Sequence, residues 1–394
     1  MTEQAYIVAA RRTPVGKAPR GVFNKTRPDD LLVHAMQGAI NDCGGLNGQQ
    51  IDDVVIGCAM PEAQQGLNIA RIANLLAGLP DSVPGFTVNR FCASGLQSIA
   101  NAADKIRLGE ADIVIAGGVE SMSMVPMTGN KFSINPAVFE DENVAIAYGM
   151  GITAENVANR WNVSREAQDE FALNSHLKAL AAREAGHYNA EILPYEVKQH
   201  LPADDGTVRI TSKLVDTDEG PRADSSIEGL ARLRPVFAAD GSVTAGNSSQ
   251  MSDGAGALVL MSETKMKSLG LEPLARFVGF AVAGVPAEIM GIGPKEAIPK
   301  LMKQTGANLA DIDWIELNEA FAAQAIAVMQ EVDLDPQKVN PLGGAIAWGH
   351  PLGATGAIRT ATMVHGLQRT NSKYGMVTMC IGTGMGAAGL FEKC

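Results

Sequence analysis

The sequence predicts an α/β protein built from two similar halves with a different region inserted between them. Short apolar runs typical of buried strands alternate with helical stretches along most of the chain. A Val-Asn pair that leads to a helix start and then to a glycine-ended strand occurs in both halves, and the middle of the chain has a different texture. The alternation also predicts a mostly parallel sheet that is covered by helices on both faces.

The N-terminal half, 1–120, carries the first set of patterns. The expected strands are AYIVAA (5–10), DVVIGCA (53–59), TVNRF (87–91) and DIVIAGG (112–118). Helices are expected over 29–44 and after Cys92, where Leu96, Ile99, Ala103 and Ile106 recur at helical spacing. We expect residues 249–270 to return to this half and complete it.

The C-terminal half, 271–394, repeats the order of these elements. "VNRFCASG", a helix and "ADIVIAGG" in the first half match "VNPLGG…GHPLGATG", a helix and "YGMVTMCIGTG" in the second. A duplication of this kind predicts that the two copies pack about a pseudo-twofold axis and bring equivalent helix starts together.

The inserted region, 121–248, begins with the methionine-rich loop SMSMVPMTGNKF and continues into an amphipathic helix and polar segments. The helix has Ser164 at its N-cap and Gly186 just past its end. We interpret this region as a substrate lid; the alternative is a surface excursion without a function.

Composition and charge exclude several classes of protein. The 394 residues are 46% hydrophobic, which suffices for a large core, and the net charge of −11 without a basic cluster argues against nucleic-acid binding. We expect no signal peptide, because MTEQAYIVAARRTP has no charged segment followed by an apolar one, and no membrane span, because the chain has no run of about 18 apolar residues. The five cysteines are widely spaced without a Cys-x-x-Cys pair, so we expect no disulfide framework, no metal site and a reducing cytoplasm.

Cys92 is the candidate nucleophile. A thiol at a helix start faces unpaired N–H groups and the positive end of the helix dipole, and both favour the thiolate. Such a nucleophile needs an imidazole, and His350 lies in the glycine-rich stretch GGAIAWGHPLGATG, where backbone can approach a ligand closely. The alternative is a histidine that caps a tight turn. The other five histidines are expected to be structural or solvated.

Two further strand ends carry candidate residues. Cys380 closes an apolar strand and is followed by Gly382, whose N–H group could hold an oxyanion. Asn318, with Glu319, follows another apolar strand and opens a helix. Each has an ordinary alternative, a small core residue for Cys380 and a helix cap for Asn318.

Five stretches together resemble the thiolase family, in family order and over essentially the whole chain: NRFCASGLQS, GNSSQMSDGA, NEAFAAQ, GGAIAWGHPLGATG and CIGTGMG. Within the family the sequence is most similar to the 3-ketoacyl-CoA thiolases of fatty-acid β-oxidation. The resemblance implies a duplicated five-layer α/β/α/β/α fold with a loop domain inserted in the N-terminal half.

The resemblance also implies a mechanism. His350 would deprotonate Cys92, which would attack the 3-keto carbonyl, and Cys380 would protonate the acetyl-CoA enolate. The N–H groups of Cys92 and Gly382 would form one oxyanion site, and His350 with a water held by Asn318 would form the other. Coenzyme A would be a substrate, and no cofactor would be permanently bound.

Binding residues are implied in the same way. Arg222 would lie near the adenine of coenzyme A, Phe237 beside the pantetheine and Ser249 in a hydrogen bond with it. Met150 and Phe321 would line the acyl side. Their ordinary alternatives are a solvated charge for Arg222, a core aromatic for Phe237 and a turn residue for Ser249.

Two positions depart from the family pattern. Acetoacetyl-CoA-specific members commonly have a histidine before the Met-Gly of the substrate loop, where this chain has Gly149. The missing imidazole favours longer or more varied acyl chains. Thr383 stands where many relatives have glycine. Threonine occurs at this position in degradative members too.

We therefore expect a degradative thiolase that cleaves a 3-ketoacyl-CoA with coenzyme A. The alternatives are an acetoacetyl-CoA thiolase that runs in the condensation direction and a non-catalytic thiolase-like lipid carrier. A decarboxylating condensing enzyme would need a histidine or asparagine in place of Cys380. The resemblance implies a homodimer or homotetramer and allows a complex with a hydratase–dehydrogenase subunit.

Overall fold

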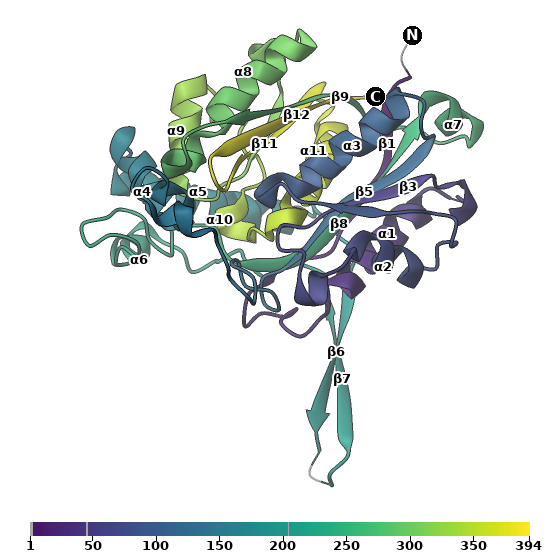
Figure 1. The fold of residues 1–394 in the computed structure, drawn as a ribbon, viewed down its shortest axis with the longest axis horizontal. Coiled ribbons are helices and arrows are strands. Elements are labelled where there is room, and N and C mark those ends of the chain that lie inside the picture. Colours follow the sequence, from purple (N-terminus) through teal and green to yellow (C-terminus); the bar gives the residue numbers. More distant parts are fainter. Residues whose placement is uncertain (1–2, 45, 204) are drawn as a thin grey trace.

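The computed structural model describes residues 3–44, 46–203 and 205–394, and its helices are layered on a large sheet (Figure 1). The sheet has the strand order β10-β11-β12-β9-β1-β8-β5-β3-β4, with β2 paired to β8. Its strands are β1 (Ala5–Arg12), β2 (Gly16–Lys17), β3 (Asp53–Gly57), β4 (Phe86–Val88), β5 (Ile113–Ser121), β8 (Ser252–Ser262), β9 (Ala275–Gly284), β10 (Trp314–Leu317), β11 (Tyr374–Ile381) and β12 (Met385–Lys393).

The expectation of a mostly parallel sheet is wrong, because the sheet is mixed. Only β3–β4, β3–β5 and β10–β11 pair in parallel, and the other pairs in the described sheet are antiparallel. β11 returns directly into β12 through a short turn, which forces an antiparallel hairpin. β5 and β8 pair in the same way, although the inserted region separates them in the chain.

The duplication is visible in the strand pairing. β4-β3-β5-β8-β1 in one half and β10-β11-β12-β9 in the other share their order and directions, and the segment at Val339 bridges to β10 in parallel where β4 pairs with β3. The two halves meet where β1 pairs with β9. The predicted duplicated α/β fold is therefore confirmed.

Helices form three layers around the two halves of the sheet, which gives the five layers that the resemblance implied. Figure 1 shows α3 and α11 between the halves, α1 and α2 outside the N-terminal half, and α8 and α9 outside the other. The helices of these layers are α1 (Pro28–Asp42), α2 (Ile69–Leu76), α3 (Ser94–Arg107), α7 (Glu263–Ser268), α8 (Pro294–Thr305), α9 (Ala322–Val332), α10 (Ala345–Trp348) and α11 (Leu352–Thr370).

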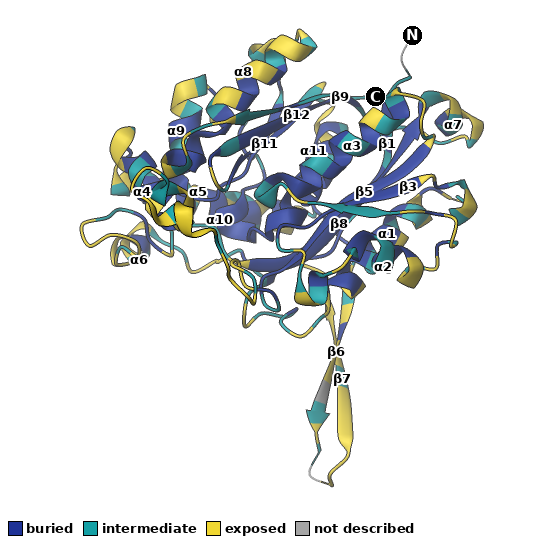
Figure 2. Cartoon of the chain, in the orientation of Figure 1, coloured by how far each residue is buried: buried dark blue, intermediate teal, exposed yellow. Residues whose placement is uncertain are grey.

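The middle layer depends on two glycines at which α3 and α11 touch. A Cβ atom on Gly95 of α3 would lie 2.7 Å from the nitrogen of Ala357 and 2.8 Å from the oxygen of Gly353 in α11. A Cβ atom on Gly356 of α11 would collide with the nitrogen of Leu96 in α3. The equivalent helix starts are therefore brought together, as the duplication predicts, and this layer is buried (Figure 2).

The inserted region contains α4 (Met150–Arg160), α5 (Arg165–Glu184), α6 (Ile227–Ala231) and a hairpin of β6 (Tyr195–Pro202) and β7 (Val208–Val215) that projects from the body (Figure 1). Ser164 caps α5 through its side chain, as predicted, and Gly186 follows that helix with a φ of 69°. The boundaries at 120/121, 248/249 and 270/271 stay a prediction. Among the described residues, none of the helices combines the length and apolarity needed to cross a membrane.

Candidate active site

Cys92 lies in a tight turn immediately before α3. The turn is the short 3-10 helix Phe91–Ala93, and Phe91 adopts a left-handed φ of 44°. Asn89 fixes this conformation by accepting the Phe91 N–H at 2.8 Å, and Ser94 donates to the Phe91 carbonyl at 2.7 Å. A left-handed non-glycine residue is strained by about 1–3 kcal/mol, and such residues concentrate at functional sites.

The expectation that Cys92 favours the thiolate is wrong for the resting protein. The residue is half-buried, and the loss of solvent around its sulfur, with a smaller contribution from the Glu120 carboxylate, raises the pKa of the Cys92 thiol to about 11. The N–H groups of Gly382 and Cys92 itself act in the opposite direction, because they hydrogen-bond to the sulfur, but they do not outweigh the burial. Cys92 therefore rests as a thiol and needs a base.

Gly382 belongs to the turn that joins β11 to β12. The next two residues, Thr383 and Gly384, have left-handed φ values of 65° and 89°. This turn directs the Gly382 N–H toward the Cys92 sulfur. A Cβ atom on Gly382 would lie 3.7 Å from the sulfur of Met150, so the turn also borders the start of α4. The sequence predicted Gly382 as an anion-holding donor, and its N–H does face the sulfur.

His350 lies between α10 and α11 and is buried. The backbone N–H of His350 donates to the Gln250 carbonyl at 2.9 Å and to the Ser252 hydroxyl at 3.1 Å, and these bonds fix the backbone of the residue. Burial lowers the pKa of His350 to about 4, and the guanidinium of Arg359 lowers it as well. The imidazole is therefore neutral at neutral pH, as a general base must be.

Hydrogen bonds on both ring nitrogens fix the orientation of this imidazole. Nδ1 lies 2.6 Å from the Thr355 hydroxyl, and Nε2 lies 3.3 Å from the Asn318 side-chain nitrogen. Because the Asn318 amide donates to Nε2, the ring proton resides on Nδ1 and points to Thr355. Nε2 then carries the electron pair, which is hydrogen-bonded by Asn318 in this structure and which accepts the proton once that contact is released.

Asn318 follows β10 and is fixed by its N–H, which donates to the Thr378 carbonyl at 2.9 Å. Its side-chain oxygen is buried and has no hydrogen-bond partner in the part of the chain that the structure describes. Glu319 beside it has a structural role, since it accepts hydrogen bonds from Ser175 at 2.7 Å and from the Ile346 N–H at 3.1 Å. Glu319 thus holds the α10 segment that leads to His350.

Cys380 is fully buried at the end of β11. Burial raises the pKa of its thiol far above the ordinary value, and negative charge on Cys92 raises it further, so the two sulfurs interact. Cys380 packs in an apolar cluster with Met290 and Phe321, and Met150 lies against this cluster. The predicted acyl-side residues, Met150 and Phe321, therefore border Cys380.

The three catalytic candidates come from three elements that meet at one place. The turn that carries Cys92 contacts both β11, which ends with Cys380, and α11, which begins after His350. The Cys92 side chain packs against a small cluster that includes Leu352, two residues after His350. The predicted convergence of distant segments is therefore present at the level of these elements.

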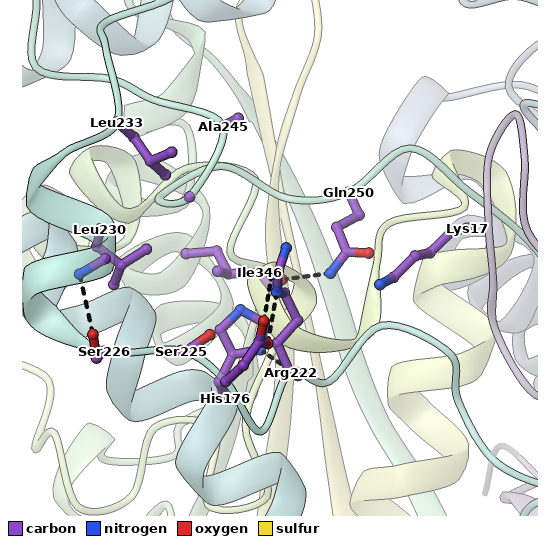
Figure 3. A pocket seen from close by; sticks show the side chains of 13 residues that line it. Lys17, His176, Arg222, Ser225, Ser226, Leu230, Leu233, Ala245, Gln250 and Ile346 are labelled. Atoms are coloured by element: carbon purple, nitrogen blue, oxygen red, sulfur yellow. Dashed lines mark hydrogen bonds and ion pairs between the residues drawn. The ribbon is translucent and has the colours of Figure 1, made fainter.

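The residues expected to hold coenzyme A lie farther out and are split between two places. Phe237 packs edge-on against Phe321 with ring centroids 6.1 Å apart, and the Ser249 N–H donates to the Ala320 carbonyl at 2.9 Å. Arg222 lines a cavity of about 430 Å³ (Figure 3), where it is exposed and paired with Asp224 at 2.8 Å.

This cavity contains residues that sequence reasoning missed. Lys17, His176 and Gln250 lie around it with Arg222 (Figure 3). Burial lowers the pKa of His176 to about 4, and its Nδ1 accepts the Arg222 N–H at 3.3 Å. Gln250 connects the cavity to the imidazole site, because its carbonyl accepts the His350 N–H. Only the position of Gln250, next to Ser249, offered a sequence signal.

Comparisons with known proteins agree with this arrangement. Residues 5–264 match the family of the thiolase N-terminal domain, and residues 271–393 match that of the thiolase C-terminal domain. The chain is 52% identical over 392 residues to a 3-ketoacyl-CoA thiolase of Bacillus subtilis, with all of both chains covered. It is 47% identical over 388 residues to the peroxisomal 3-ketoacyl-CoA thiolase of Homo sapiens, covering 98% of this chain and 90% of the relative.

Solved structures give the same result. The crystal structure of the Bacillus anthracis acetyl-CoA acetyltransferase is 40% identical, with a TM-score of 0.89 and coverage of 100% of this chain and 99% of that one. Human mitochondrial 3-ketoacyl-CoA thiolase in complex with CoA is 38% identical, with a TM-score of 0.89 and coverage of 100% and 98%. The chain belongs to the thiolase family.

Proposed function

We propose that this protein is a degradative 3-ketoacyl-CoA thiolase, which cleaves a 3-ketoacyl-CoA with coenzyme A into acetyl-CoA and a shortened acyl-CoA. The observation that carries the proposal is the placement of Cys92 between the Gly382 N–H, the Cys380 thiol and the start of α11 after His350. The names of the full-length relatives support the same activity.

The first half-reaction uses the neutral resting pair. Nε2 of His350 takes the proton of Cys92 as the sulfur attacks the 3-keto carbonyl. The negative charge moves to the carbonyl oxygen, where the N–H groups of Cys92 and Gly382 hold it; such a donor is worth about 3–4 kcal/mol. The C2–C3 bond then breaks, leaving an acyl-cysteine and the enolate of acetyl-CoA, which takes the proton of Cys380.

The second half-reaction restores every group. The Cys380 thiolate takes the proton of the coenzyme A thiol, and the resulting thiolate attacks the acyl-cysteine. The acyl group leaves on coenzyme A, and His350 returns its proton to Cys92. The raised pKa of Cys380 suits this role, because a weakly acidic thiol can protonate a basic carbanion and then regain its proton.

The buried amide of Asn318 supports the second oxyanion site. Its unpartnered oxygen can accept a hydrogen bond from a water that in turn donates to the thioester oxygen of the acetyl unit. The cavity that Arg222 lines supports a place for the adenine of coenzyme A near this residue, and the contact of Phe237 with Phe321 supports a pantetheine that passes Phe237 and Ser249 toward the acyl site.

Space at Gly149 supports the degradative subtype. A Cβ atom on Gly149 would meet no atom within 4 Å, so this position before Met150 is open. The alternative, an acetoacetyl-CoA thiolase working toward condensation, is favoured by the name of the similar Bacillus anthracis structure. We further propose a cytoplasmic homodimer or homotetramer, which the family resemblance supports.

Thiolysis of 3-ketodecanoyl-CoA and acetoacetyl-CoA by the purified protein tests this proposal. We expect turnover of both substrates and an acyl group on Cys92, detected by mass spectrometry after a rapid acid quench. Turnover of acetoacetyl-CoA alone would establish the alternative subtype. An unmodified Cys92 and no turnover of either substrate would instead leave a thiolase-like lipid carrier.

A further inference from the structure

Glu120 is a fully buried carboxylate at the end of β5. Its Oε2 accepts the N–H groups of Ala59 and Gly353, both at 2.8 Å. Its Oε1 accepts the Gln65 side-chain N–H at 2.7 Å and the Met60 N–H at 3.2 Å. One carboxylate thus joins the loop after β3, in the N-terminal half, to the first turn of α11, in the C-terminal half.

This carboxylate supplies the cap that α11 does not make for itself. The N-cap residue is Pro351, which has no side-chain hydrogen bond to the helix, and the free N–H of Gly353 is satisfied by Glu120 instead. A negative charge at a helix N-terminus also interacts favourably with the helix dipole. A Cβ atom on Gly353 would lie 2.8 Å from Oε2, so the glycine is what lets the carboxylate approach.

The segments that donate hydrogen bonds to Glu120 are also the segments against which the Cys92 side chain packs. The Cys92 side chain packs against a cluster that contains Ala59 and Leu352, with Met60 at its edge. Ala59 and Met60 donate directly to Glu120, and Leu352 precedes the donor Gly353. Ala59 belongs to the N-terminal half and Leu352 to the C-terminal half, and Glu120 accepts hydrogen bonds from both of these segments.

We propose that Glu120 is a positioning residue of the active site, whose carboxylate ties the loop at Ala59 to the start of α11 and thereby sets the position of Cys92 relative to His350. This inference rests on the proposed thiolysis. Glu120 touches neither substrate nor the reacting atoms in this role. It acts through two backbone segments: the loop at Ala59, against which Cys92 packs, and the start of α11, which follows His350.

Only a carboxylate satisfies this site. Each oxygen accepts two N–H donors, and glutamine would turn its NH₂ group toward one of these pairs. Aspartate would keep the charge, but its shorter side chain would not reach both the loop and the helix. The charge has a second effect that geometry alone would not produce, because it raises the pKa of the Cys92 thiol.

Two variants, Glu120→Gln and Glu120→Asp, test the proposal against wild-type protein and a matched control. The control is Asp53→Asn, a buried carboxylate at the opposite end of the neighbouring strand β3, where it pairs with Lys105 at 3.1 Å. Steady-state thiolysis gives kcat and KM, and iodoacetamide alkylation of Cys92 against pH reports its ionisation. Circular dichroism and thermal melting show whether each variant is folded.

We expect kcat to fall about 10- to 100-fold in both Glu120 variants, with KM for coenzyme A changed less than about threefold. Glu120→Gln should also shift the midpoint of Cys92 alkylation to lower pH, whereas Glu120→Asp should leave the midpoint near that of wild type.

A folded Glu120→Gln with unchanged kcat overturns the inference. So does a loss of the same size in Asp53→Asn. If Glu120→Gln does not fold, Glu120→Asp decides alone: unchanged kcat in that variant overturns the inference. An inactive wild-type protein would instead refute the proposed function.

Discussion

The two halves of the molecule use the same pair of elements, a strand end and a helix start, in opposite ways. Asp52 accepts the N–H of Ile113 at the start of β5, and Asp313 accepts that of Tyr374 at the start of β11. Counted from these matching anchors, Glu120 corresponds to Ile381, the residue before Gly382. Each strand end faces the helix start of the other half: the β11 turn faces Cys92 before α3, and Glu120 faces Gly353 in α11.

The difference lies in what each strand end brings. The C-terminal half brings an N–H donor to the start of α3, so negative charge can be held beside Cys92. The N-terminal half brings a carboxylate to the start of α11, so the free N–H of that helix is already occupied. In the proposed mechanism, one copy of the duplicated unit would therefore bind the developing anion, and the other, whose helix start is already bound to Glu120, would carry the base.

Removing the nucleophile breaks this division most severely. Cys92→Ala should lower kcat by about 10⁴-fold or more, because no acyl intermediate can form. Steady-state thiolysis and mass spectrometry of the quenched enzyme measure the effect, with circular dichroism as the control for folding. Near-normal turnover would contradict the role of the α3 start.

Removing the base tests the other helix start. His350→Ala should lower kcat by about 10²–10⁴-fold, the range for a lost general base. Because the pKa of His350 is lowered to about 4, the imidazole is neutral above that pH and becomes protonated only below it. Wild-type kcat/KM should therefore stay high well below pH 6.5. A fall in kcat/KM with a midpoint near pH 6.5 would argue against His350 as the general base.

Changing the thiol at the end of β11 separates the two chemical steps. Cys380→Ser should slow carbon–carbon cleavage by about 10²-fold and slow acyl exchange between Cys92 and coenzyme A much less. Thiolysis of acetoacetyl-CoA measures the first step, and exchange of labelled coenzyme A into acetyl-CoA measures the second. Equal losses in both assays would remove Cys380 from its role as acid to the carbanion.

A substitution in the inserted region tests a second difference between the halves. The inserted region joins β5 to β8 in the N-terminal half, whereas a short turn joins β11 to β12 in the C-terminal half. Gly149→His should fill the open position before Met150 and lower the ratio of kcat/KM for 3-ketodecanoyl-CoA to that for acetoacetyl-CoA by about tenfold. Gly149→Ala is the matched control and should change this ratio little. An unchanged ratio in the histidine variant would show that chain length is set elsewhere.

The smallest effect is expected at the hydroxyl that orients the base. Thr355→Val removes the 2.6 Å partner of His350 Nδ1 and should lower kcat by about three- to tenfold, in line with a typical hydrogen bond. Thr355→Ser keeps the hydroxyl and should restore most of the rate. Equal losses in both variants would indicate a packing effect rather than a tautomer that Thr355 fixes.

Much of this architecture could be predicted from the sequence, because it depends on patterns that repeat. The strands at Ala5 and Asp53 and the helix capped by Ser164 lie where periodicity and capping placed them. The direction of the strands could not be predicted, since a buried strand has the same apolar pattern in a parallel or an antiparallel pair. The mixed sheet follows from connections and not from the strands themselves.

The site was predictable in its residue types but not in its charge states. Cys92 stands out by its place at a predicted helix start, and His350 and Cys380 stand out by their glycine-rich surroundings. The raised pKa of Cys92 could not be predicted, because it comes from burial and from Glu120, which is near in space only. Thr355 could not be predicted either, because it lies five residues after His350, which precedes α11, and this separation is not one of the i,i+3 or i,i+4 spacings that bring side chains together on a helix.

The crossing of α3 and α11 at Gly95 and Gly356 makes each half of the chain the cover of the other. A solitary half would leave the glycine-lined side of its central helix in water, with the apolar layer around it uncovered. The strand ends of the two halves can therefore differ in chemistry while the contact between the central helices stays the same.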